Sequence, residues 1–217
     1  MTTIYPTRGE LQNSRFVRMA LGGLAGTLIL LIGPIDSLAD ANLTVHMFQH
    51  VGLFASAAFF GYALDRILIF RLLWLKRRIH LGWRAFVGLM QFNSKTRGLI
   101  FAALLPSIAL FYWNLPSAFD LAVSNGYIHI LEHLTYIVIG TFVGATVNAV
   151  PRKFKATLLL LAFMMAGMMG SMMVVWPYFY PVFSATQNTQ MDTAMMLFGA
   201  VGVIATSSWL LKVLDVL

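Results

Sequence analysis

The sequence predicts an all-α membrane protein, a single bundle of six transmembrane helices with both termini in the cytoplasm. Of its 217 residues, 59% are hydrophobic and only 11% are charged, far from the composition of an average soluble domain. The apolar residues occur in blocks of about twenty, the length that crosses a bilayer as a helix. No polar stretch is long enough for a separate soluble domain, so we expect one domain over residues 1–217, embedded in the cell membrane.

The apolar blocks predict six spans, with boundaries good to a few residues, at about 17–35, 43–64, 99–115, 127–147, 157–176 and 194–214. The first block follows basic residues as a signal peptide would, but no small-residue cleavage site comes after it, which favours a retained span. The third block is short and contains Pro106. Neighbouring helices of a bundle absorb such a kink.

The basic residues predict the orientation of the bundle. All fifteen Lys and Arg precede the first span, lie between the second and third or the fourth and fifth, or close the last span. The other three loops contain acidic residues instead: Asp36, Asp40, Asp120 and Asp192. The positive-inside rule makes the basic side cytoplasmic. The net charge of +7 therefore reflects topology, and we expect no nucleic-acid partner. The basic and apolar segment 65–98 is typical of an amphipathic helix on the anionic inner leaflet.

Two of the predicted spans begin with a pair of histidines, His46 with His50 and His129 with His133. A spacing of four places both rings of a pair on one face of a helix. Both spans start on the outer side, so the four imidazoles and Glu132 are expected at the same depth. Ionisable residues inside a span are costly and indicate a functional site.

These residues predict a metal site. Imidazole is the commonest protein metal ligand, and two helices with such pairs can supply three or four nitrogens to one ion. Glu132 is either a further ligand or an acceptor that fixes an imidazole tautomer on a neighbouring helix; alternatively it is a carboxyl held neutral in the bundle. The alternative is that the histidines only hydrogen-bond across helices, as polar residues do in membrane bundles. We favour a metal or proton role because four of the five histidines are paired and matched in depth.

Two neighbouring features extend this prediction. Met47 lies inside the HMFQH stretch, and its thioether is a soft ligand that selects Cu(I); alternatively Met47 faces lipid. The aromatic loop between the fifth and sixth spans contains Trp176, Tyr178 and Tyr180. Such residues are typical of the aromatic belt at a membrane interface, and the loop is alternatively a lid over the site.

The HMFQH and HILEH stretches, with an aromatic loop that ends in an Asp before the last span, resemble the CtaG-type cytochrome oxidase assembly proteins and a related group of archaeal membrane proteins. The resemblance covers about residues 43–64 and 120–200. Members are polytopic helical proteins implicated in copper supply to membrane oxidases, although they often have an extra span. The resemblance implies a membrane oxidase as partner and a copper site at His46, Met47, His50, His129, Glu132, His133 and Asp192.

The sequence leaves four functions open. We favour a copper-binding assembly protein, since no redox-cofactor motif accompanies the histidines. It is alternatively an accessory subunit of a copper-dependent oxidase or monooxygenase complex, whose histidines are structural or bind a metal shared with neighbouring subunits. A membrane zinc hydrolase would use three histidines and an acid, with Glu132 or Asp192 as base. A single haem held by His50 and His133 is the fourth alternative. The chain has no cysteine, so thiolate sites are excluded.

Overall fold

The structure, a computed structural model, describes residues 8–32, 34–71, 82, 97–147, 150–176 and 178–214. The secondary structure of these residues is entirely helical, as the sequence predicts. The helices are α1 (Arg8–Leu31), α2 (Pro34–Ala41), α3 (Leu43–Arg71), α5 (Arg97–Trp113), α6 (Pro116–Ser124), α7 (Gly126–Val147), α8 (Arg152–Val175) and α9 (Ala185–Val213).

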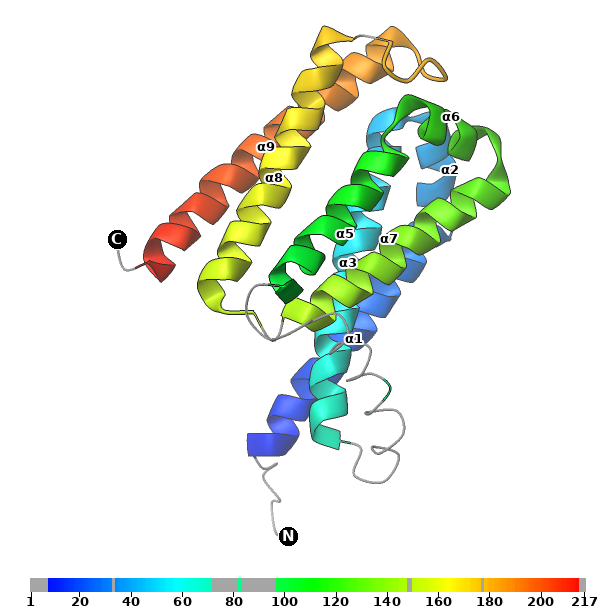
Figure 1. The fold of residues 1–217 in the computed structure, drawn as a ribbon. Helices are drawn as coiled ribbons and strands as arrows, with labels where there is room; N and C mark the ends of the chain where they lie inside the picture. Colours follow the sequence, from blue (N-terminus) through cyan, green and yellow to red (C-terminus); the bar gives the residue numbers. More distant parts are fainter. Residues whose placement is uncertain are drawn as a thin grey trace.

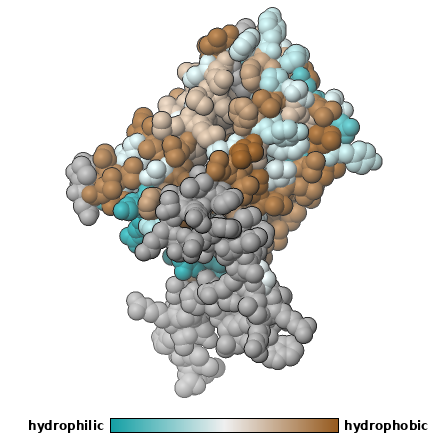
Figure 2. Space-filling view, in the orientation of Figure 1, coloured by the Kyte–Doolittle hydropathy of each residue, from teal (hydrophilic) through white to brown (hydrophobic). Residues whose placement is uncertain are grey.

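Five of these helices are long and apolar enough to cross a membrane: α1, α3, α7, α8 and α9. Helix α5 has 17 residues, with Pro106 inside it, and its apolar part is shorter. Apolar side chains cover much of the visible face of the described helices (Figure 2), and apolar patches of this kind mark membrane contact. The protein is therefore a multi-pass membrane protein that contacts the lipid bilayer.

Two short helices interrupt segments that were expected to be loops. Helices α2 and α6 begin at Pro34 and Pro116, and proline at the first helical position has a backbone angle already suited to a helix. Of the expected amphipathic segment 65–98, residues 65–71 continue α3 and residues 97–98 begin α5. The rest of that segment, apart from residue 82, lies outside the described residues.

Helix α9 begins nine residues earlier than the sequence predicts, at Ala185 instead of residue 194. The Ser184 side chain accepts a hydrogen bond from the Gln187 amide at 3.3 Å, and this N-cap satisfies a backbone donor that the first turn leaves free. Asp192 consequently lies about two turns inside the helix and not in the preceding loop, where the sequence predicts it.

Helix α3 packs against α1 and α7, while α8 and α9 form a hairpin (Figure 1). Glycines explain how closely α3 and α7 approach. A Cβ atom on Gly144 would collide with the Ala58 carbonyl, and one on Gly61 would collide with the Thr141 carbonyl. Small residues let membrane helices pack backbone against backbone in this way. A Cβ atom on Gly140 would likewise come too close to the Phe54 carbonyl.

The glycines of α1 differ in how closely they approach α3. A Cβ atom on Gly26 would contact the Ser56 side chain of α3, whereas one on Gly22 would have no heavy atom within 4 Å among the described residues. Gly23 makes the closest approach, against the backbone of Phe60. The face of α1 that meets α3 therefore carries Gly23 and Gly26.

Helices α2 and α6 and the α8–α9 loop gather at one end of the bundle, where α3, α7 and α9 begin (Figure 1). Helix α1 begins at the opposite end. Asparagine caps start two of these long helices: the Val45 amide donates to Asn42 Oδ1 at 3.1 Å, and the Tyr127 amide donates to Asn125 Oδ1 at 3.0 Å. Because such caps fix where a helix begins, the histidines a few residues further on lie at the same depth.

Candidate metal centre

Four residues from α3 and α7 converge at this end of the bundle. His46 and His50 come from α3, and His129 and Glu132 come from α7; each offers a ligand atom, and these atoms all lie within 4.8 Å of one another. The rings of His46 and His129 stack across the interface between α3 and α7, with their centroids 5.2 Å apart. The expected pairing of the two histidine-bearing helices is confirmed.

The fourth imidazole, His133, lies beside this group. Its ring contacts His129 at a centroid distance of 4.2 Å and His50 at 5.2 Å, but it is not one of the four converging residues. A bis-histidine haem would need its iron and porphyrin plane between the two ligand rings. The direct edge-to-face contact of His50 with His133 does not fit that arrangement.

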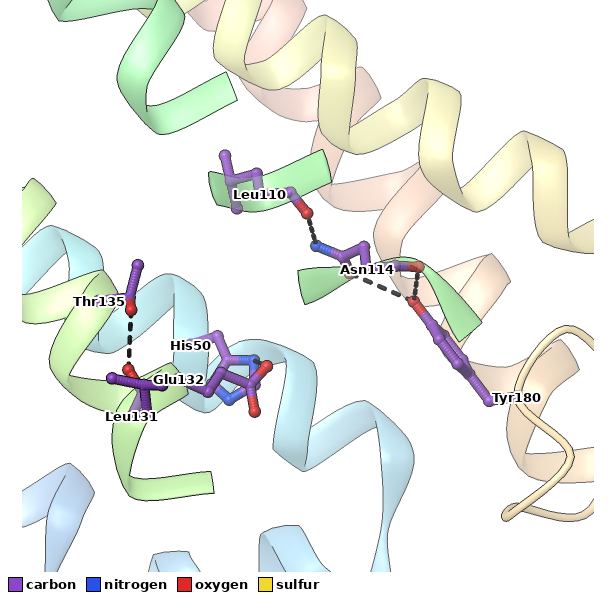
Figure 3. Close-up of polar contacts among 7 residues, drawn as sticks. All are labelled: His50, Leu110, Asn114, Leu131, Glu132, Thr135 and Tyr180. Carbon is purple, nitrogen blue, oxygen red and sulfur yellow. Dashed lines mark hydrogen bonds and ion pairs between the residues drawn. The ribbon is translucent and has the colours of Figure 1, made fainter. Parts of the chain in front are cut away.

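Glu132 faces His50 across the interface between α7 and α3. Its Oε1 atom lies 3.5 Å from His50 Nδ1 (Figure 3), and both side chains are almost fully buried. Carboxylates that contact one ring nitrogen of a histidine set its tautomer and orientation, which leaves the other nitrogen as the ligand atom. Here that other nitrogen is His50 Nε2. Glu132 can thus orient a ligand or be one itself, the two metal-site roles that the sequence predicts for it.

The donor atoms of this cluster lack protein hydrogen-bond partners. Within the described chain, the Nε2 atoms of all four histidines and both carboxylate oxygens of Glu132 are buried and make no hydrogen bond. Buried polar groups are nearly always hydrogen-bonded, and each one left unpaired costs about 1–3 kcal/mol. A metal ion would accept several of these lone pairs at once. The residues present therefore fit a metal ion.

Two further expected ligands lie outside the group of four. Met47 packs in a buried hydrophobic cluster with Phe119, Met191 and Met195. Asp192 is buried on α9, and both of its carboxylate oxygens lack a hydrogen-bond partner among the described residues, but it is not one of the converging residues. The role of Met47 and Asp192 as ligands stays a prediction.

A protein-family model matches nearly the whole chain. It is described as "Protein of unknown function (DUF1404)" and covers residues 25–215. The chain belongs to the DUF1404 family. The DUF1404 match includes both histidine pairs, the short helices beside them and the α8–α9 loop. No curated protein and no solved structure matches the chain.

The α8–α9 loop packs against α6 next to the candidate centre in this DUF1404 protein. Tyr180 is fully buried and packs on Phe119 of α6 with their rings 4.1 Å apart. Phe119 in turn contacts the ring of His46 at 5.0 Å. Trp176 and Tyr178 are exposed, at 65% and 69%, as expected for an aromatic belt. The exposure of Trp176 and Tyr178 thus fits the expected belt, whereas Tyr180 is buried and does not. The role of the loop as a lid over the site stays a prediction. Phe119 was not singled out from the sequence because its function depends on this tertiary contact.

Hydrogen bonds hold the loop in place. The Tyr180 hydroxyl donates to the Asn114 backbone oxygen at 3.1 Å (Figure 3). Burial raises the pKa of Tyr180 well above its usual range, so the hydroxyl keeps the proton that it donates. From α9, Asn188 Nδ2 donates to the carbonyl oxygens of Tyr180, Phe183 and Ser184, while its Oδ1 accepts from the Tyr180 amide at 3.1 Å.

We expect Asn188→Ala to loosen this loop, because the variant loses all four hydrogen bonds and leaves buried backbone groups unpaired. An unpaired buried group costs about 1–3 kcal/mol, so amide exchange over residues 178–184 should accelerate. The matched control is Thr189→Ala, an exposed neighbour whose hydroxyl donates only to the Ala185 carbonyl of its own helix. Equal exchange in the two variants would contradict the anchoring role of Asn188.

Proposed function

We propose that this protein binds copper in the membrane and acts in the assembly or metal supply of a membrane oxidase. The observation that carries the proposal is the convergence of His46, His50, His129 and Glu132, whose buried donor atoms lack protein partners. When bound, copper would supply a cation that these lone pairs coordinate. The protein holds and transfers the ion, so no catalytic base is required.

The donor types favour copper over other ions. Imidazole suits copper, zinc, iron and nickel alike, and Cu(II) has the highest affinity for such sites in the divalent series. The thioethers of Met47, Met191 and Met195 lie in one cluster beside Phe119, and Phe119 contacts His46. Thioethers select Cu(I), so copper suits both the imidazole nitrogens and the thioether sulfurs. The resemblance to the CtaG-type assembly proteins supports the same metal and a membrane oxidase as partner.

The proposed topology has six spans, in which α5 joins the five long helices, and both termini lie in the cytoplasm. Helix α5 has 17 residues and is therefore about 26 Å long at 1.5 Å per residue. This is somewhat shorter than a typical hydrocarbon core, and local thinning of the bilayer accommodates such a helix. The end that carries α2, α6 and the α8–α9 loop lies opposite the start of α1. That end has no Lys or Arg in its loops, which supports an outward-facing site.

Elemental analysis of the detergent-purified protein tests this function. We expect about one copper per chain, the stoichiometry of a single site built from the four converging residues, and little copper in a His50→Ala/His133→Ala double variant. Zinc in place of copper would favour a zinc hydrolase with Glu132 as base. No metal in either protein would overturn the proposal and leave the histidines a structural role. Purification in a stoichiometric oxidase complex would favour an accessory subunit.

A further inference from the structure

Helix α2 brings a carboxylate against the turn of α3 that carries the histidines. Gln49 lies between His46 and His50 in the sequence and is 1% exposed. Its Nε2 atom donates to Asp36 Oδ1 of α2 at 2.9 Å and to the Leu30 carbonyl at 2.7 Å. These two bonds use both protons of the amide nitrogen and fix the orientation of the group.

The amide oxygen of Gln49 is left without a partner. Its Oε1 atom is buried and makes no hydrogen bond to the described residues. Such an atom is rare in a native structure, and here it is held next to the Asp36 carboxylate by the bond that Nε2 makes. One buried acceptor and one carboxylate therefore lie side by side, and both suit a cation.

Asp36 is half-buried and is held beside the turn of α3 that carries His46 and His50, because it accepts the hydrogen bond from Gln49. Its negative charge therefore lies next to the candidate centre. No Lys or Arg occurs between Met19 and Asp65, so no basic residue in this part of the chain neutralises Asp36. A negative charge at the mouth of a low-dielectric site raises the local concentration of cations and their association rate.

We propose that Asp36 and Gln49 Oε1 form an uptake site for the metal cation beside the histidine centre. This inference rests on the proposed function and adds the route by which the ion arrives. The cation first contacts the half-buried Asp36 carboxylate and then the buried Oε1 atom of Gln49. It then passes to the imidazole nitrogens of the same turn, His46 and His50, which bind copper more tightly than oxygen donors do.

The test compares Asp36→Asn with Asp40→Asn in the full-length, detergent-purified protein. Both variants remove one negative charge from α2, but Asp40 is exposed. Asparagine at position 36 still offers an oxygen to Gln49 Nε2, so α2 keeps its bond to α3. Binding of Cu(II) ions is followed by stopped-flow quenching of tryptophan fluorescence at low ionic strength, and the final copper content is measured by elemental analysis.

We expect Asp36→Asn to slow copper association about tenfold, within the range of electrostatic steering, with an unchanged final copper content. Asp40→Asn should slow copper association less than twofold, which is well below the range of electrostatic steering. Equal rates in the two variants would overturn the uptake site while leaving the proposed function intact. A lower final copper content in Asp36→Asn would make Asp36 a ligand of the centre and would also overturn the uptake role. If the unmodified protein binds no copper, both proposals fail.

Discussion

Replacing His50 with alanine is expected to abolish copper retention. His50 is one of the four converging residues, and its Nδ1 atom lies 3.5 Å from Glu132 Oε1. The variant therefore loses a ligand and also leaves the buried carboxylate without its partner. Loss of a residue that only orients a ligand costs 10–100-fold in metal affinity, so loss of the ligand itself should cost about 100-fold or more. Competition with a chelator, followed by elemental analysis, measures this change.

The loss of copper binding is expected to differ among the alanine variants of the other histidines. His129→Ala should act like His50→Ala, because His129 also belongs to the converging group, whereas His133→Ala should weaken binding less, because His133 does not. This pair is closely matched, since both residues lie on α7 one turn apart. His80→Ala serves as the negative control: His80 is the fifth histidine of the sequence and lies outside the described residues. Full copper content in a monodisperse His50→Ala variant would show that the site is misassigned.

The sequence predicts the helical bundle and the meeting of the two histidine pairs for a simple physical reason. In a bilayer, every apolar block of sufficient length must satisfy its backbone internally, so it becomes a helix. The spacing of four then places His46 with His50, and His129 with His133, on single faces. The cost of exposing these polar rings to lipid brings the two faces together, as their stacked rings confirm.

The parts of the site that the sequence does not predict depend on contacts between distant segments. The start of α9 is polar, and a hydropathy criterion assigns it to a loop. In the structure Asn188 fits inside this helix because carbonyl oxygens of the preceding loop accept its protons. Phe119 belongs to the site through its ring contact with His46 of α3, and Asp36 belongs to it through its hydrogen bond with Gln49. No local pattern in the sequence marks these three residues as part of one centre.

The most severe effect on folding is expected from Gly144→Ala. A Cβ atom at this position collides with the Ala58 carbonyl of α3, and backbone atoms of two packed helices cannot move aside as a flexible side chain would. Overpacking of this kind costs about 1–3 kcal/mol, occasionally more. Because α3 and α7 each carry half of the candidate centre, their separation should also lower the copper content. The measurements are the melting temperature and the monodisperse fraction in size-exclusion chromatography.

The matched control is the same substitution at Gly22 of α1, where an added Cβ atom would have no heavy atom within 4 Å among the described residues. Alanine is favoured over glycine in a helix interior by about 1 kcal/mol, so Gly22→Ala should leave the melting temperature unchanged or raise it. The same chemical change is thus expected to lower the melting temperature at Gly144 but not at Gly22. If Gly144→Ala melted no lower than Gly22→Ala and kept its copper, α3 and α7 would not pack backbone to backbone, and the convergence of their histidines would lose its structural basis.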